Sequence, residues 1–146
     1  MLTYKYLGVY FASNLSWEAH INHISAKANQ SLGFLRRNLH MANWETKLVA
    51  YTTLIRSQLE YASIIWNPHQ RFLTQKLELV QNRATRFILK NYTRTSITSL
   101  KEKLGLPPLA DRRKISRLAS LHTLYYHCPS KRELYCRAAP HISCIY

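Results

Sequence analysis

The sequence predicts a mostly α-helical fold, in which a short N-terminal β-strand precedes a bundle of about five helices. Apolar residues recur at steps of three and four along most of the chain, which is the spacing of one helix face. The first residues instead concentrate β-branched and aromatic side chains, which are typical of strands. Hydrophobic residues make up 47% of the chain, which is too much apolar mass for a disordered basic tail.

The strand is predicted over Thr3 to Phe11, which reads TYKYLGVYF. Gly8 within it is typical of a bulge or of a close approach by another backbone. Because no second strand is evident, we expect the hydrogen-bonding partner to come from another chain or from a longer parent chain. Ser16 is then expected to cap a long first helix. Its apolar stripe is Trp17, Ile21, Ile24, Ala28, Leu32, Leu35 and Leu39.

Two longer helices follow. Asn43 is expected to cap the second, which begins at Trp44 and places Glu45 in its positive first turn. The stripe of this helix is Trp44, Leu48, Tyr51, Ile55, Leu59 and Ala62. Asn67-Pro68 separates it from the third helix. The third stripe is Leu73, Leu77, Val80, Ala84 and Phe87, and this helix is expected to end near Asn91.

The last two predicted helices are separated by glycine and proline. A short fourth helix is expected to open at Thr98 or Ser99, because Ser99 and Glu102 have the spacing of a capping box. Gly105 closes it, and Pro107-Pro108 can begin the next helix. The fifth helix is expected to run from about Leu109 to His127, and residues 128–146 form an irregular tail. Its buried side is expected to contain Ile115, Leu118, Ala119 and Tyr125.

The charge of the chain indicates an anionic partner. Lys and Arg total 21 while Asp and Glu total 7, so the formal net charge is +14. Such a surplus repels itself in the compact state and is typical of proteins that bind nucleic-acid backbones or acidic membranes. Any single basic cluster is more often a solvated helix face, but a surplus spread over three helices favours an anionic polymer as partner. The candidate nucleic-acid contacts are Lys5, Arg36, Arg37, Lys76, Arg83, Arg86, Lys90, Arg112, Arg113, Lys114 and Arg117.

No motif in the sequence predicts a catalytic site, a cofactor or a metal ion. The seven carboxylates are at least nine residues apart, so no local pair is available for acid–base chemistry. His20 and His23 have a zinc-compatible spacing but no third ligand nearby, and the tail residues Cys128, Cys136, His141 and Cys144 lack the close cysteine pair of zinc modules.

No apolar run could span a bilayer, and the odd cysteine count favours reduced thiols. We therefore expect an intracellular protein of the cytoplasm or nucleus.

Several segments together carry a resemblance to a known family. They are Tyr4-Lys5-Tyr6-Leu7-Gly8-Val9, Leu15-Ser16-Trp17, His20-Ile21, YTTLIRSQLEYASIIWNP from Tyr51, LELVQNRATRFI from Leu77, and LGLPPLADRRKISRLASL from Leu104. In this order and spacing they resemble the reverse transcriptases of non-LTR retrotransposons, especially jockey- and CR1-like elements. The resemblance extends from Tyr4 to about His127.

The resemblance implies an RNA-directed DNA polymerase fragment. Residues 1–14 would be a palm remnant with the primer grip at Tyr6, Leu7 and Gly8, and residues 15–127 a thumb-like helical domain. The implied partners are an RNA/DNA template–primer duplex and the missing palm and fingers, with no membrane. The intact enzyme would use a divalent metal, Mg²⁺.

This sequence departs from the family where catalysis would occur. Asp111 is its one aspartate, and the Phe-Ala-Asp-Asp motif that would hold the metal is missing. We therefore expect this chain alone to be inactive. Two alternatives stay open: a relic of a truncated transposable element with no function, and a cationic protein of membrane surfaces.

Overall fold

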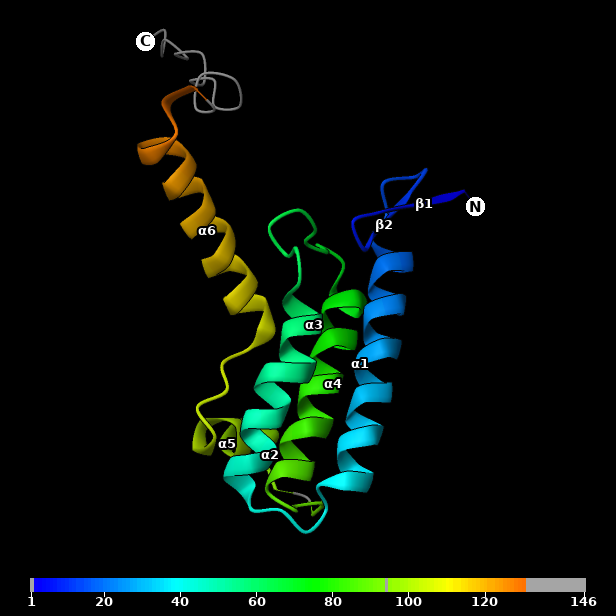
Figure 1. Cartoon of the computed structure of the whole chain (residues 1–146), viewed down its shortest axis with the longest axis vertical. Helices are drawn as coiled ribbons and strands as arrows, with labels where there is room; N and C mark the ends of the chain where they lie inside the picture. Colours follow the sequence, from blue (N-terminus) through cyan, green and yellow to red (C-terminus); the bar gives the residue numbers. More distant parts are fainter. Residues whose placement is uncertain (1, 94, 131–146) are drawn as a thin grey trace, which may run out of the picture.

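A β-hairpin sits on one end of a helical bundle in the computed structural model, which describes residues 2–93 and 95–130 (Figure 1). The elements are β1 (Thr3–Tyr6), β2 (Val9–Ala12), α1 (Glu18–Asn38), α2 (Trp44–Ala50), η1 (Tyr51–Arg56), α3 (Ser57–Glu60), α4 (Arg71–Ile88), α5 (Ile97–Lys103) and α6 (Leu109–His127). Because α2, η1 and α3 follow one another without a break, the described residues form five helical segments. The predicted fold class is confirmed.

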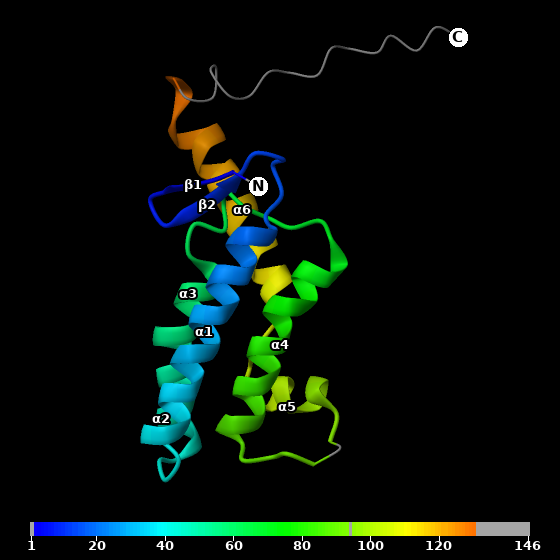
Figure 2. The ribbon, with the colours of Figure 1, turned by 90° about the vertical axis from the view of Figure 1, so that its right-hand side faces the viewer.

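The helices α1 and α4 lie side by side and run in the same direction (Figure 2). The α2–η1–α3 rod returns in the opposite direction behind α1, and α5 lies beside the lower end of α4 (Figures 1 and 2). The last helix, α6, contacts α4 near its own beginning and then projects away from the bundle (Figure 1). No other described helix or strand covers the outer face of the α1–α4 pair (Figure 2).

The N-terminal segment is a hairpin and not the single strand that its composition predicted. Leu7 and Gly8 adopt positive φ angles of 45° and 83°, and this turn pairs β1 with β2 in antiparallel register. The expectation that the partner strand lies outside the chain was therefore wrong for this pairing. All four residues of β1 are nevertheless exposed, and the described part of the chain offers its outer edge no further strand.

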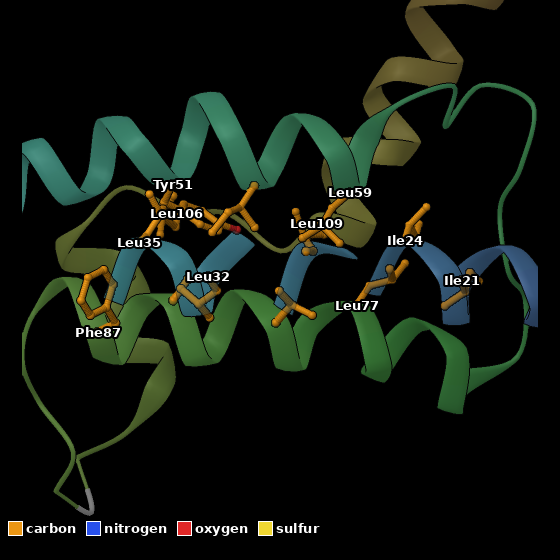
Figure 3. Packing of buried hydrophobic residues seen from close by; sticks show 14 of the residues in the cluster. Ile21, Ile24, Leu32, Leu35, Tyr51, Leu59, Leu77, Phe87, Leu106 and Leu109 are labelled. Carbon is orange, nitrogen blue, oxygen red and sulfur yellow. The ribbon is translucent and has the colours of Figure 1, made fainter. Parts of the chain in front are cut away.

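The core forms where the predicted apolar stripes meet. Residues from α1, the α2–η1–α3 rod, α4 and the α5–α6 connection converge on it, among them Ile21, Leu32, Tyr51, Leu59, Leu77, Phe87 and Leu109 (Figure 3). At its centre, Tyr51 Oη donates to Gln81 Oε1 at 2.9 Å, and Gln81 Nε2 donates to the carbonyl of Pro107 at 2.9 Å. Burial is thus accompanied by hydrogen bonding, as buried polar groups require.

The second predicted stripe is only partly buried. Trp44 is 49% exposed, although its spacing placed it with Tyr51 and Ile55. The segment from Tyr51 to Arg56 is a π-helix, whose wider turn changes the register of the stripe. Residues before the π-helix therefore face a different direction from the one that a regular helix would give them.

Local signals at helix ends succeeded where a single side chain decides the geometry. Asn43 Oδ1 accepts from the Thr46 amide at 2.9 Å, and Gly105 adopts a φ of +61° after α5, so both predictions are confirmed. Ser16 Oγ accepts from the Glu18 amide at 3.2 Å, but the N-cap position of α1 is Trp17, so Ser16 lies one residue before it. The predicted capping box was wrong, because α5 begins at Ile97 and no side chain caps its N-terminus.

The bounds of α6 agree with the prediction, but its predicted buried side does not. Ile115 and Leu118 are 65% and 56% exposed, and Tyr125 and Ala119 are also exposed. Its fully buried side chains are Leu109 and Arg113. The prediction was wrong because α6 leaves the bundle after its first turns, so its later apolar residues find no neighbouring helix in the described structure (Figure 1).

A buried histidine predicts that acid destabilises the fold. His20 is 0% exposed, and its Nδ1 accepts from the Tyr10 amide at 3.4 Å. Burial, helped by the charge of His23, lowers the pKa of His20 from 6.5 to about 4. Between these values the unfolded chain binds a proton that the folded chain does not. The free energy of unfolding should therefore fall by roughly 2–3 kcal/mol as pH drops through this window.

Urea denaturation at pH 7 and pH 4.5 measures this effect. The His20→Gln variant should show a smaller loss of stability than the parent chain over the same interval. The variant of an exposed histidine, His69→Gln, should behave like the parent. An unchanged pH dependence in His20→Gln would show that His20 does not cause it.

Candidate nucleic-acid interface

A row of basic side chains lies along the contact between α1 and α4. Lys76 Nζ donates to Asn22 Oδ1 at 2.5 Å, and Arg83 Nη1 donates to Asn29 Oδ1 at 3.0 Å. Arg36 Nη2 donates to the backbone oxygen of Arg83 at 3.3 Å. We call these five residues the α1/α4 seam. Its members on each helix are seven positions apart, which is about 10 Å along the helix axis. Lys76 and Arg83 therefore lie about 10 Å apart along α4, and Arg36 is the cation that α1 contributes.

The seam cations keep their charge available to a ligand. Lys76, Arg83 and Arg36 are exposed, and asparagine oxygens orient the first two without neutralising them. Among the residues that the structure describes, ion pairs involve only Lys101 with Glu78 and Arg112 with Glu60. The seam thus offers cations and amides, the side chains that commonly contact phosphate oxygens.

The predicted primer-grip residues form the turn of the hairpin. Tyr6, Leu7 and Gly8 are exposed, and Tyr61 Oη donates to the Leu7 carbonyl at 3.0 Å. This hydrogen bond ties the turn to the end of α3. The Lys5 ammonium lies 5.4 Å from the centre of the Tyr10 ring.

A cavity of about 420 Å³ lies beside this turn, between the hairpin, α1 and α3. Its basic lining residues are Lys5, His23 and Lys27, and the others include Gly8 and Gln58. None of its described lining residues is a carboxylate. The cavity and the seam lie on opposite flanks of α1, since Lys27 faces α3 while Asn22 and Asn29 contact α4.

The turn gives a test of its own geometry. Replacing Gly8 by Ala should destabilise the chain by about 1 kcal/mol, because its φ of +83° is costly for any residue with a Cβ. A Cβ there would also lie 3.4 Å from Tyr61 Cε1, which is ordinary contact, so backbone conformation and not crowding sets the cost. Urea denaturation measures the loss. Gly33, which has no positive φ, provides the control, and Gly33→Ala should not destabilise its helix.

Two predicted phosphate contacts are instead engaged within the protein. Arg112 forms a bidentate ion pair with Glu60, in which Nη2 lies 3.0 Å from Oε2. Arg113 is 1% exposed, and its guanidinium carbon lies 5.8 Å from the centre of the Trp66 ring. Burial lowers the pKa of Arg113. The prediction for Arg113 was wrong, because α6 turns this side of its first turns into the bundle, whereas Arg112 stays half-buried with its charge paired by Glu60.

The remaining candidates lie apart from the seam. Arg86 donates to the backbone oxygens of Thr93 at 2.8 Å and Thr95 at 3.4 Å, so it holds the loop after α4. Lys90 is exposed just beyond α4. Arg37 is exposed on α1, whereas Lys114 is exposed and Arg117 half-buried on the projecting α6. The structure therefore groups Lys76, Arg83 and Arg36 and leaves the other exposed cations scattered.

Sequence reasoning missed the residues that organise the interface. Asn22 and Asn29 precede Arg36 at seven-residue steps, matching the step from Lys76 to Arg83, and this pattern could have signalled paired helices. The contact of Tyr61 with Leu7 spans 54 residues and has no sequence signal.

The described residues do not fit the divalent metal that the resemblance implies. No three His, Cys, Asp or Glu side chains gather into a potential metal site in ranges 2–93 and 95–130. Glu60 and Glu78 are engaged by Arg112 and Lys101. No metal-dependent step is assigned to this chain. Of the tail ligands, Cys128 is half-buried, while Cys136, His141 and Cys144 lie outside the described residues.

Comparison with known proteins adds no relative. No family model, no curated protein and no solved structure matches this chain. The helices of the described structure include none with the length and apolarity that crossing a membrane requires.

Proposed function

We propose that this chain binds the phosphate backbones of a nucleic-acid duplex across the exposed face of α1. It would do so as the primer-grip and thumb portion of a non-LTR retrotransposon reverse transcriptase, whose catalytic palm is a separate part. The single observation that carries the proposal is the α1/α4 seam, where Arg36, Lys76 and Arg83 are exposed, aligned and unpaired by carboxylates.

The surroundings of the seam support an extended anionic ligand. The opposite flank of α1 carries Lys27 beside the hairpin turn, and Lys5 of the hairpin lines the same cavity. The helix between the two flanks contains one carboxylate, Glu18, in its first turn. A polymer lying over α1 would thus meet cations on both sides and little repulsion between them. Backbone contacts of this kind position a duplex without reading its sequence.

The hairpin supports the part of the proposal that concerns a missing palm. A two-stranded hairpin is marginal by itself, and β1 exposes both its residues and its outer edge. A further strand added to this edge would extend the sheet and cover Tyr4 and Tyr6, which are 69% and 58% exposed. The palm of the parent enzyme is the partner that we propose for this edge.

A salt series tests the proposal. An RNA/DNA hybrid with a fluorescent end is titrated with the full chain at several salt concentrations, and anisotropy reports the affinity. Three phosphate contacts should give a slope of about −3 in a plot of log K against log salt. A slope near zero would contradict backbone binding.

The exposed apolar residues of α6 favour one competing function, binding to a membrane surface. Ile115, Leu118 and Leu121 are more than half exposed, and Lys114 lies next to them. Vesicles of phosphatidylcholine with phosphatidylserine distinguish the two. Tighter binding to these vesicles than to the hybrid at equal salt would favour the membrane function. The duplex proposal expects the reverse order.

A further inference from the structure

The cavity beside the hairpin turn is built by three separate elements. The turn, the first half of α1 and the end of α3 line its volume of about 420 Å³, and the hairpin lies at the end of the bundle where α1 begins (Figure 2). This size falls in the range of small-molecule sites. Because the cavity lies on the flank of α1 away from the seam, the seam contacts do not fill it.

The neutral polar side chains on the cavity wall each make a hydrogen bond within the protein. Tyr61 Oη donates to the Leu7 carbonyl at 3.0 Å, and Gln58 Nε2 donates to Ser31 Oγ at 3.2 Å. Ser57 Oγ donates to a backbone oxygen one turn earlier in the rod. These groups hold the three elements together, and the polar contacts that remain for a ligand come from the basic residues.

The basic residues on the wall are free and gathered on one side. Lys27 and His23 are exposed and form no hydrogen bond or ion pair with the residues that the structure describes. They lie four positions apart and therefore on the same face of α1. The ring of Tyr10 contacts both the His23 ring, at 4.7 Å between centres, and the Lys5 ammonium, at 5.4 Å. This shared contact brings Lys5 close to the exposed face of α1.

Carboxylates do not balance these charges. Glu18 and Glu60 are the acidic residues closest along the chain to the lining segments, and neither belongs to the described lining. Glu60 is paired with Arg112 on α6. The cavity thus contains two lysines whose positive charges no acidic neighbour compensates, and an anion would supply the missing partner.

We propose that this cavity binds a phosphate monoester. Such an ester carries close to two negative charges at pH 7.5, because its second pKa is about 6, and this matches the charges of Lys5 and Lys27. A phosphodiester inside a strand carries one negative charge and matches them less well. The phosphate oxygens would accept from the two ammonium groups, with His23 beside them. The organic part of the ester would lie against Leu7 and the ring of Tyr61.

Two sources would present this chemistry to the cavity. One is a free small phosphate ester, and the other is the terminal phosphate of a nucleic-acid strand. For the strand end, the inference rests on the proposed duplex function. For the free ester, it stands by itself.

Titration with phenyl phosphate at pH 7.5, followed by the amide NMR signals of the full chain, tests the proposal. Saturable shifts are expected at Gly8 and Lys27, with a dissociation constant of about 1 mM. Phenyl sulfate has a similar shape and one negative charge, so it should bind at least about fivefold more weakly. Equal binding of the two compounds, or no saturable shift with phenyl phosphate up to about 10 mM, would overturn the proposal.

Variants locate the ester in the cavity. Lys27→Gln and Lys5→Gln should each weaken phenyl phosphate binding at least about fivefold, because each removes one of the two ammonium groups. Lys103→Gln removes the same charge from an exposed position on α5 and should change the affinity less than about twofold. All three lysines are exposed, so the variants should fold, and far-UV circular dichroism verifies this. Equal losses in the three variants would overturn the proposal, since general charge would then explain the binding.

Two short single strands of DNA, one with a 5′-phosphate and one with a 5′-hydroxyl, distinguish the sources. Tighter binding of the phosphorylated strand supports the strand end as the source. Equal binding of the two strands, together with saturable binding of phenyl phosphate, supports the free ester. A chain that binds the RNA/DNA hybrid with the expected salt slope but not phenyl phosphate would refute the cavity proposal alone. The reverse result would refute the duplex proposal and leave the cavity proposal supported.

Discussion

Reversing two seam charges, in the double variant Lys76→Glu, Arg83→Glu, is expected to weaken binding of the RNA/DNA hybrid at least about 30-fold at 0.15 M salt. Each phosphate contact releases close to one counterion, which contributes a factor of about 5 at this salt concentration. Two contacts multiply these factors, and the introduced carboxylates add repulsion. Both side chains are exposed and bond only to asparagine oxygens, so the fold should remain intact.

The matched control is the double variant Arg71→Glu, Lys103→Glu, which changes the net charge by the same amount. Arg71 lies on α4 about 140° around the axis from Lys76, and Lys103 lies at the end of α5. Both are exposed, and neither borders the seam. Its affinity should fall less than about fivefold, as expected for a general loss of charge.

Anisotropy gives the affinities, and the salt slope gives the number of contacts. The seam variant should lose about two units of slope, whereas the control should lose little. Far-UV circular dichroism verifies that both variants keep the helicity of the parent. If the two doubles lose the same affinity, net charge alone governs binding and the seam is not the contact surface.

The largest effect on stability is expected at Arg113. Arg113→Glu should reduce the free energy of unfolding by more than about 4 kcal/mol, because it buries a carboxylate near two others. The charges of Glu60 and Glu78 favour the guanidinium that is now present, and they would repel a carboxylate in its place. A loss of this size is a large fraction of the total stability of a small domain.

Arg113→Met, by contrast, should leave the free energy of unfolding within about 1 kcal/mol of the parent value. Nε and Nη1 of Arg113 are buried without hydrogen-bond partners, so methionine removes an unmet cost while it fills similar space against Trp66. Urea denaturation of the three chains measures both effects. If Arg113→Glu folds as stably as the parent, Arg113 is exposed in solution. It would then again be a candidate contact for phosphate.

The elements were predictable where neighbouring residues decide them. The stripe of α4 from Leu73 to Phe87 is buried as its spacing predicted, and α6 begins and ends at the predicted residues. Asn43 and Gly105 set helix ends through their own side chain or lack of one. The hairpin turn at Leu7-Gly8 was missed, because a continuous β-rich run conceals a reversal that one glycine permits.

The candidate site was predictable only as a set of cations. Composition and helical spacing identified Lys76, Arg83 and Arg36, but equally Arg112 and Arg113, because a basic residue at a helix flank looks the same in sequence whether it is free or paired. Glu60 lies 52 residues from Arg112, and that distance along the chain hides the ion pair. The buried His20 was likewise missed, since its shielding depends on Trp66.

The sequence by itself determined the helical class, the order of the helices and the cationic surplus, because periodicity, caps and charge count are properties of short segments. Tertiary structure alone decided which cations face solvent. The packing of α1 on α4 aligns the seam, while the approach of α6 buries Arg113 and pairs Arg112 with Glu60. Burial and pairing depend on which distant segment covers a given face. The sequence of a single helix does not show which segment packs against it.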